Sequence, residues 1–224
     1  MEAFLNAART GDLEQLKRLL DAGADVLNAR NELGQSAILL ARYHRQQAAV
    51  DFLLARRPDL TLHEACAVGH AERVREVVGR VGSGAPEIDA HSKDGFTPLA
   101  LACFFGQQEI AAYLVDQGAN VNLAATNPMK VAPLHAAVAS RHFWIAQMLV
   151  ANGANVNQTQ QNGFTPLHAA AMNGDEPCVR LLLENNADRT ARSDTSQTAL
   201  DMALLKGHAA VADLLDPPEA PPGE

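Results

Sequence analysis

Short apolar runs along this chain end repeatedly in the same kind of polar turn. In one of them, the side chains of Val179, Leu181, Leu182 and Leu183 are expected to face inward from a single helix. The turns that follow such runs read Gly-Ala-Asx or Asn-Ala-Asp, at residues 23–25, 118–120, 153–155 and 186–188. The pattern therefore predicts a series of short helices, each closed by a tight turn.

A second pattern recurs in phase with these turns. Residues 163–171 read GFTPLHAAA, and degraded copies occur at residues 95–102, 132–137 and 198–203. Pro133 and Pro166 are 33 residues apart, and Pro98 and Pro133 are 35 apart. A period in this range is typical of a stacked repeat array.

The residue types in one copy explain where its helices begin. Thr165 is a good N-cap, since its hydroxyl can accept a hydrogen bond from a free backbone NH of the first turn. Pro166 then occupies the first helical position, where no NH is missed. Gly174 supplies the turn between two helices, and Asp175 caps the second helix. Each repeat is therefore predicted to be a helix-turn-helix unit.

These motifs resemble the repeat of the ankyrin family over almost the whole chain. The resemblance implies an all-α fold, an ankyrin-repeat solenoid of stacked helix-turn-helix units joined by β-hairpin-like fingers. We expect one ankyrin repeat domain over residues 1–216, with about seven repeats whose first and last members act as caps. Four prolines among the last nine residues predict a disordered, acidic tail over residues 217–224.

Three places break the repeat pattern. The join near Leu60 is too short for a full hairpin, so a finger is predicted to be missing between the second and third repeats. Residues 81–86 form a glycine-rich run about four residues longer than the family turn, which is typical of a mobile loop. The finger at residues 123–131 is two residues over the pattern, with Met129 and Lys130 near its tip.

Charge and composition narrow the classes of partner. The net charge of −8 comes entirely from residues 81–224, which hold seven Lys or Arg and fifteen Asp or Glu. An acidic half disfavours nucleic acid as a partner.

The sequence has no apolar run long enough for a membrane span and no signal-peptide pattern, so we expect no membrane contact and a cytoplasmic location. Cys66, Cys103 and Cys178 are widely spaced, which favours buried thiols over disulfides.

The sequence offers no catalytic, metal or cofactor motif. There is no phosphate loop, no nucleophile elbow and no HExxH pair, so the chain is predicted not to be an enzyme and to need no cofactor. His135 and His168 follow leucine in the repeat motif. At that position the resemblance implies an imidazole that hydrogen-bonds around the helix start.

Protein binding is the function that the sequence favours. In the ankyrin family, partners commonly contact the finger tips and the exposed ends of the first helices on the concave face. The candidate partner-binding residues at these positions are Tyr43, His44, Val68, Phe96, Phe104, Phe105, Met129, Lys130, Met172 and Asn173. Aromatic groups among them suit interface anchors. The lone Trp144 falls at an outer-helix position that the resemblance implies is solvent-facing or lightly packed. Packing against the neighbouring helix is favoured there over a role as partner anchor.

Three hypotheses about function follow. The first is a monomeric, non-catalytic interaction module or adaptor whose protein partner is unidentified. The second is an inhibitor or regulatory subunit of an enzyme, which the sequence does not separate from the first. The third and least favoured is an atypical ligand-binding protein or enzyme with a pocket near the irregular second and third repeats.

Overall fold

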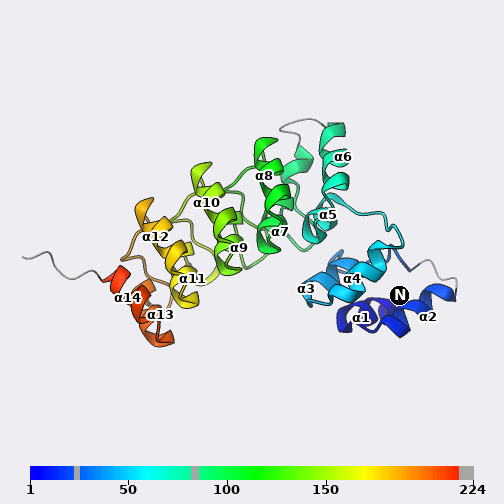
Figure 1. Cartoon of the computed structure of the whole chain (residues 1–224), viewed down its shortest axis with the longest axis horizontal. Helices are drawn as coiled ribbons and strands as arrows, with labels where there is room; N and C mark the ends of the chain where they lie inside the picture. Colours follow the sequence, from blue (N-terminus) through cyan, green and yellow to red (C-terminus); the bar gives the residue numbers. More distant parts are fainter. Residues whose placement is uncertain (23–25, 82–85, 217–224) are drawn as a thin grey trace, which may run out of the picture.

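The computed structural model describes residues 1–22, 26–81 and 86–216, and it shows an elongated stack of helix pairs (Figure 1). The predicted glycine-rich loop and the predicted tail lie largely or wholly outside these residues. In each pair the first helix belongs to an inner row and the second to an outer row. Neighbouring inner helices pack side by side, and so do neighbouring outer helices, with the exception of α4 and α6.

The helices are short and regular in length. The inner helices are α1 (Glu2–Thr10), α3 (Ala37–Tyr43), α5 (Leu62–Val68), α7 (Pro98–Phe104), α9 (Pro133–Ala139), α11 (Pro166–Asn173) and α13 (Ala199–Lys206). The outer helices are α2 (Leu13–Asp21), α4 (Gln47–Leu54), α6 (Ala71–Val81), α8 (Gln108–Asp116), α10 (Phe143–Ala151), α12 (Glu176–Glu184) and α14 (Ala209–Leu215). Two 3-10 turns, η1 (Pro86–Asp89) and η2 (Gln161–Gly163), lie between pairs.

Most inner helices begin after a serine or threonine N-cap, as the sequence predicts for the repeat motif. The Thr97 side chain accepts a hydrogen bond from the Ala100 NH at 3.1 Å, and Thr198 forms a capping box with Asp201. In α9 the same position is Ala132, which offers no side-chain cap. A threonine cap typically adds about 1 kcal/mol to the stability of a helix. The helix α9 lacks this stabilisation, whereas its neighbours α7 and α11 begin with a threonine cap.

Most inner helices end in a residue with left-handed backbone conformation. Glycine occupies this position after α5 and α11, as Gly69 and Gly174, where positive φ carries no steric cost. Arg45 and Arg141 take the same conformation after α3 and α9, with φ of 58° and 62°. These two arginines are therefore in a conformation that favours glycine.

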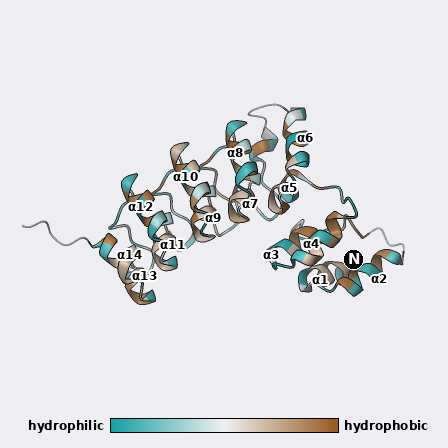
Figure 2. Ribbon diagram, in the orientation of Figure 1, coloured by the Kyte–Doolittle hydropathy of each residue, from teal (hydrophilic) through white to brown (hydrophobic). Residues whose placement is uncertain are grey.

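Alanine and leucine fill the core, and the helices can approach closely because these side chains are small. Most of the buried apolar residues form one continuous cluster along the whole stack, from Phe4 to Leu215, and Leu39, Ala67 and Leu101 form a second, small cluster. Among the outer helices, α10 carries no charged residue, and Figure 2 draws it in light brown tones, toward the hydrophobic end of the scale. A continuous core is what makes a repeat array one folded unit.

The segments before the inner helices form the predicted β-hairpin-like fingers. Within one finger the Ser92 NH donates to the Phe96 carbonyl at 2.9 Å. Adjacent fingers are linked as well, since the Thr126 NH donates to the Gly95 carbonyl at 3.0 Å. Gly95 is required there, because a Cβ would lie 2.8 Å from the backbone nitrogen of Asn127. One isolated bridge, Arg30 with Ser36, is the strand-like pairing in the described residues.

The finger predicted to be missing is absent. Seven residues, 55–61, connect α4 to α5, and Figure 1 shows α1–α4 displaced from the line of the later helices. The first finger instead reaches the finger beyond the gap, where the Gln35 amide donates to the Asp94 carboxylate at 3.0 Å. The ion pair of Arg30 with the buried Glu64 joins the same finger to α5.

Candidate functional site

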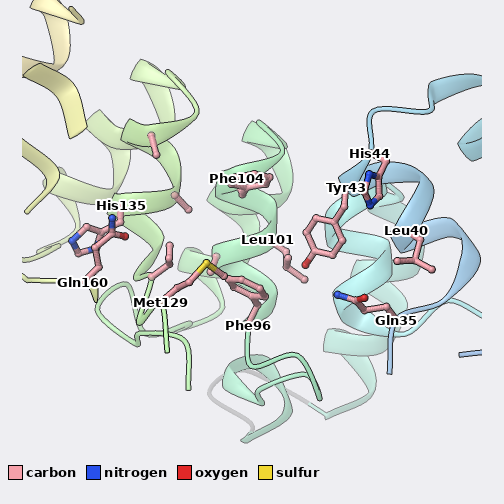
Figure 3. Close-up of a pocket in the computed structure, with 14 residues that line it drawn as sticks. Gln35, Leu40, Tyr43, His44, Phe96, Leu101, Phe104, Met129, His135 and Gln160 are labelled. Carbon is pink, nitrogen blue, oxygen red and sulfur yellow. The ribbon is translucent and has the colours of Figure 1, made fainter. Parts of the chain in front are cut away.

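A groove of about 510 Å³ opens on the face formed by the inner helices and fingers (Figure 3). We call this the inner groove. Its lining residues are mostly apolar and come from α3, α7, α9 and four fingers: Gln35, Leu40, Tyr43, His44, Phe96, Ala100, Leu101, Phe104, Met129, Val131, His135, Ala136, Ala139 and Gln160. Its volume lies within the range of about 300–1,000 Å³ that ligand pockets occupy.

Tyr43 forms the wall of the groove on the α3 side. Its hydroxyl donates to the Asp94 carboxylate at 3.3 Å, which fixes the ring across the gap left by the missing finger. Burial, the charge of Asp94 and this hydrogen bond all raise the pKa of Tyr43. The phenol is therefore neutral and acts as a donor at neutral pH.

The helix α5 does not line the groove, because side chains from its neighbours cover it. Phe105 packs against Tyr43 with ring centroids 5.5 Å apart, and both lie against a small cluster that contains Ala67 of α5. Arg42 completes this cover, with Nε donating to the Ala67 carbonyl at 3.0 Å and Nη2 to the Phe105 carbonyl at 3.3 Å. Its guanidinium also lies 4.8 Å from the centre of the Phe105 ring.

Large apolar side chains stand exposed along the rest of the groove. Phe104 is 44% exposed and Met129 is 45% exposed, and Figure 3 shows Phe96 and Met129 near the middle of the groove. Ala139 occupies in α9 the position that Phe104 occupies in α7, since each is the last residue of a seven-residue helix. The small side chain of Ala139 leaves the space open beyond Phe104.

His135 lies at the far end of the groove and is 1% exposed. In the equivalent His168, Nδ1 hydrogen-bonds with the Thr165 hydroxyl at 2.9 Å. Ala132 replaces that threonine, and neither ring nitrogen of His135 has a hydrogen-bond partner of good geometry, although backbone groups of Gln158 and Phe164 approach the ring. The implied pairing around the helix start is thus present in His168 and incomplete in His135.

Burial lowers the pKa of His135 to about 4, and the nearby backbone groups offset this only in part. The imidazole is therefore neutral at physiological pH. A neutral, buried imidazole beside Gln160 adds a polar group to an otherwise apolar groove.

The candidate binding residues fall into two groups. Tyr43, His44, Phe96, Phe104 and Met129 line the inner groove together. The other candidates do not line it: Val68 and Phe105 are half-buried against the core clusters, Lys130 is exposed in its finger, and Met172 and Asn173 lie farther along the inner row.

Sequence reasoning missed several lining residues. Leu40, Leu101 and Val131 have the pattern of core positions, His135 has the pattern of a framework residue, and no motif marks Gln160. The small residue Ala139, placed between Phe104 and Met172 at equivalent positions, is the signal that could have indicated an opening.

Trp144 is 66% exposed, so the expectation that it packs against a neighbouring helix is wrong. Its ring contacts Phe143 edge-on, with centroids 5.5 Å apart. The equivalent residue in the next repeat, Pro177, is also exposed, because this position of the outer helix points away from both neighbours.

The chemistry elsewhere in the described residues is limited. Cys66, Cys103 and Cys178 are free and buried, and burial raises the pKa of all three thiols. Among the residues that the structure describes, no three His, Cys, Asp or Glu side chains are grouped to hold a metal ion. Within the same residues, every helix is too short or too polar to cross a bilayer.

Stacked helix pairs with projecting fingers and a continuous core define a helical-repeat protein. A family model described as ankyrin repeats (3 copies) matches residues 62–160 and 134–220. The chain belongs to the ankyrin repeat family.

Several curated proteins are similar over most of the chain. The B-cell lymphoma 3 protein homolog of Mus musculus is 26% identical over 222 residues, covering 92% of this chain and 49% of that protein. The ankyrin repeat protein nuc-2 of Neurospora crassa is 28% identical, covering 96% of this chain and 24% of that protein. The putative palmitoyltransferase ZDHHC13 of Danio rerio is 30% identical, with coverages of 89% and 32%. The chain thus spans half the length of these relatives or less, and the similarity is confined to the repeats.

Proposed function

We propose that this protein is a non-catalytic interaction module that holds a protein partner on its inner face and finger tips. The observation that carries the proposal is the inner groove, in which Phe104 and Met129 are nearly half exposed beside Tyr43 and Phe96. Exposed apolar clusters of this kind commonly mark interaction sites, and buried aromatic anchors contribute much of the binding energy at interfaces.

Two features favour the inner groove over other apolar surfaces. Hydrogen bonds from Tyr43 and Gln35 to Asp94 hold one wall in place without a partner, so little order has to be gained on binding. Trp144 on the outer row is more exposed, but within the described residues its ring contacts only Phe143 among the aromatic side chains, and it lines neither of the two hollows at Tyr43 and at Arg73. As further parts of the proposal, residues 1–216 act as one monomeric unit with terminal caps, and the buried thiols suit a reducing compartment such as the cytoplasm.

The proposal is tested by capture from an extract of the source cells, followed by mass spectrometry. The native chain, Phe104→Ser and Trp144→Ser serve as baits, and we expect proteins captured by the native chain and by Trp144→Ser to be lost from Phe104→Ser. Loss from Trp144→Ser alone would assign the contact to the outer row instead. If a captured partner is an enzyme, its activity with and without the native chain tests whether the protein is an inhibitor or regulatory subunit.

A small apolar ligand is the second candidate function. The size and apolar lining of the inner groove, at the place where the repeat pattern is irregular, favour this candidate specifically. Native mass spectrometry of the purified protein would show a bound molecule as an added mass, and Ala139→Phe should displace it by filling the open end of the groove.

A further inference from the structure

The carboxylates of the acidic half of the chain are not spread evenly around the array. Thirteen Asp and Glu residues are described between residues 86 and 216, and ten of them lie on the outer helices or in the segments that flank those helices. These ten are Glu87, Asp89, Glu109, Asp116, Asp175, Glu176, Glu184, Asp188, Asp213 and Asp216. The carboxylates described in this half of the chain are therefore concentrated on the side away from the inner groove.

The three remaining carboxylates lie on fingers or inner helices. Asp94 accepts hydrogen bonds from Gln35, Tyr43 and Ser92, and Asp201 is occupied in the capping box with Thr198. Asp194 lies in the finger before α13, two fingers beyond the one that carries Met129. Of these carboxylates only Asp94 is near the groove, and its oxygens are already engaged by donors.

Cations border the groove on two sides. Lys93 lines a shallower hollow of about 470 Å³ that shares Gln35, Phe96 and Met129 with the inner groove. Lys130 follows Met129 in the next finger and is exposed. Across the groove, Arg45 follows His44 and is exposed at the end of α3. None of these three cations takes part in an ion pair within the described part of the chain.

We propose that the segment seated in the inner groove is an acidic stretch of a partner protein that presents a large apolar side chain. The apolar side chain would enter the space beside Phe104 and Met129, and flanking carboxylates would lie near Lys93, Lys130 and Arg45. This inference rests on the proposed function and adds the chemistry of the partner. Complementary charge of this kind mainly sets the association rate and excludes partners of the wrong sign.

Nucleic acid is a poorer match to the same surface. Affinity for a phosphate backbone grows with the number of phosphates that cations neutralise, about six to ten in a strongly salt-dependent complex, whereas three cations outside ion pairs border this groove. Between the cations the lining is leucine, alanine, methionine and phenylalanine, which suits an apolar side chain better than a sugar-phosphate chain.

The probe for this inference is a displayed library of short random peptides selected on the purified native chain. We expect selected peptides to contain Asp or Glu next to Trp, Phe, Leu, Ile or Met. A synthetic version of one such peptide should bind about tenfold more weakly to the double variant Lys93→Glu, Lys130→Glu, and binding to the native chain should weaken with added salt. Arg180→Glu on the outer helix α12 is the control, because Arg180 is also exposed but lies on the outer row. The Arg180→Glu variant should bind the peptide as tightly as the native chain does.

The outcomes separate the two levels of the proposal. Peptides that depend on Phe104 but are neutral or basic would overturn the acidic partner and leave the proposed function standing. Peptides whose binding is unchanged by Phe104→Ser, or the absence of any selected peptide, would count against both. Binding of a random oligonucleotide pool that is lost with Lys93→Glu, Lys130→Glu would overturn the protein segment as occupant. Circular dichroism of each variant shows whether the fold is intact.

Discussion

Arg30 binds Glu64 across the place where the repeat pattern loses a finger. The two residues are 34 apart in sequence, and Nη2 of Arg30 lies 3.0 Å from Oε2 of Glu64, with a second contact between Nη1 and Oε1. Glu64 is 2% exposed and also accepts from the Thr61 NH at 2.8 Å. Burial alone raises the pKa of Glu64, but hydrogen bonds from Arg30, Ser36 and Thr61 outweigh it, and the net pKa is lowered.

Glu64→Gln should destabilise the protein by about 2 kcal/mol. The substitution leaves the Arg30 guanidinium without its counter-charge, and the cost is below the value of a fully buried pair because Arg30 is about one third exposed. Urea unfolding followed by circular dichroism measures the loss. Glu76→Gln, which removes an exposed partner of Arg73 and Arg80, is the control and should change little. Equal effects of the two substitutions would show that the Arg30–Glu64 pair has no special part in joining the repeats.

Stability should fall as the pH is lowered from about 6.5 to about 4, in part because of His135. Its pKa is about 4 in the folded protein and about 6.5 when unfolded, so the unfolded state takes up the proton first. The stability that the protein gains by keeping His135 neutral is fully present above about pH 6.5. This stability is lost as the pH falls through the pKa of His135 in the folded protein. The urea concentration at the unfolding midpoint, measured across this pH range for the native chain and for His135→Gln, shows whether stability falls with falling pH because of His135. A variant with the same pH slope as the native chain would exclude His135 as the source.

Ala132→Thr should stabilise the protein by about 1 kcal/mol. The threonine hydroxyl would cap α9 and reach Nδ1 of His135, as Thr165 does for His168. Thr97 and Thr165 are as buried as Ala132, so the site accepts a side chain of this size in neighbouring repeats. Thermal unfolding gives the change, with Ala132→Val as a control that adds a similar bulk without the hydroxyl. A gain in Ala132→Val as large as in Ala132→Thr would mean that packing, and not capping, is responsible.

Phe104→Ser and Phe105→Ser should have opposite consequences, although the residues are adjacent. Phe104 is 44% exposed, so its loss should change the free energy of unfolding by less than about 1 kcal/mol while weakening partner binding. Phe105 packs under Tyr43 and Arg42, so its loss should cost about 3 kcal/mol. Urea unfolding of the two single variants separates these roles. Similar losses of stability would place Phe104 in the core.

Arg45→Gly should raise stability by about 1 kcal/mol. Arg45 has φ of 58°, where an L-residue is strained and glycine is not. The matched variant Arg141→Gly relieves the same strain at φ of 62° but loses the hydrogen bond from Nη2 to the Asn173 carbonyl at 2.8 Å, so its gain should be smaller. Differential scanning calorimetry measures both. A destabilised Arg45→Gly would indicate that Arg45 makes a favourable contact that outweighs the strain.

The repeat register and the helix starts can be predicted from the amino-acid sequence, because these depend on local chemistry. Threonine caps, proline at the first helical position and glycine in left-handed turns act within a few residues of their position. The short join before Leu60 likewise predicted the missing finger from chain length alone. Repetition strengthened each of these inferences, since one well-formed copy at residues 163–171 identified the weaker ones.

Which apolar residues are exposed and free to bind becomes visible only in the folded arrangement of the repeats. Phe104 and Phe105 have the same side chain in adjacent positions, and only the packing of α3 over α5 shows that one is covered by Tyr43 and Arg42 while the other faces the groove. Exposure arises from contacts between residues far apart in the chain, and a local pattern does not specify those contacts.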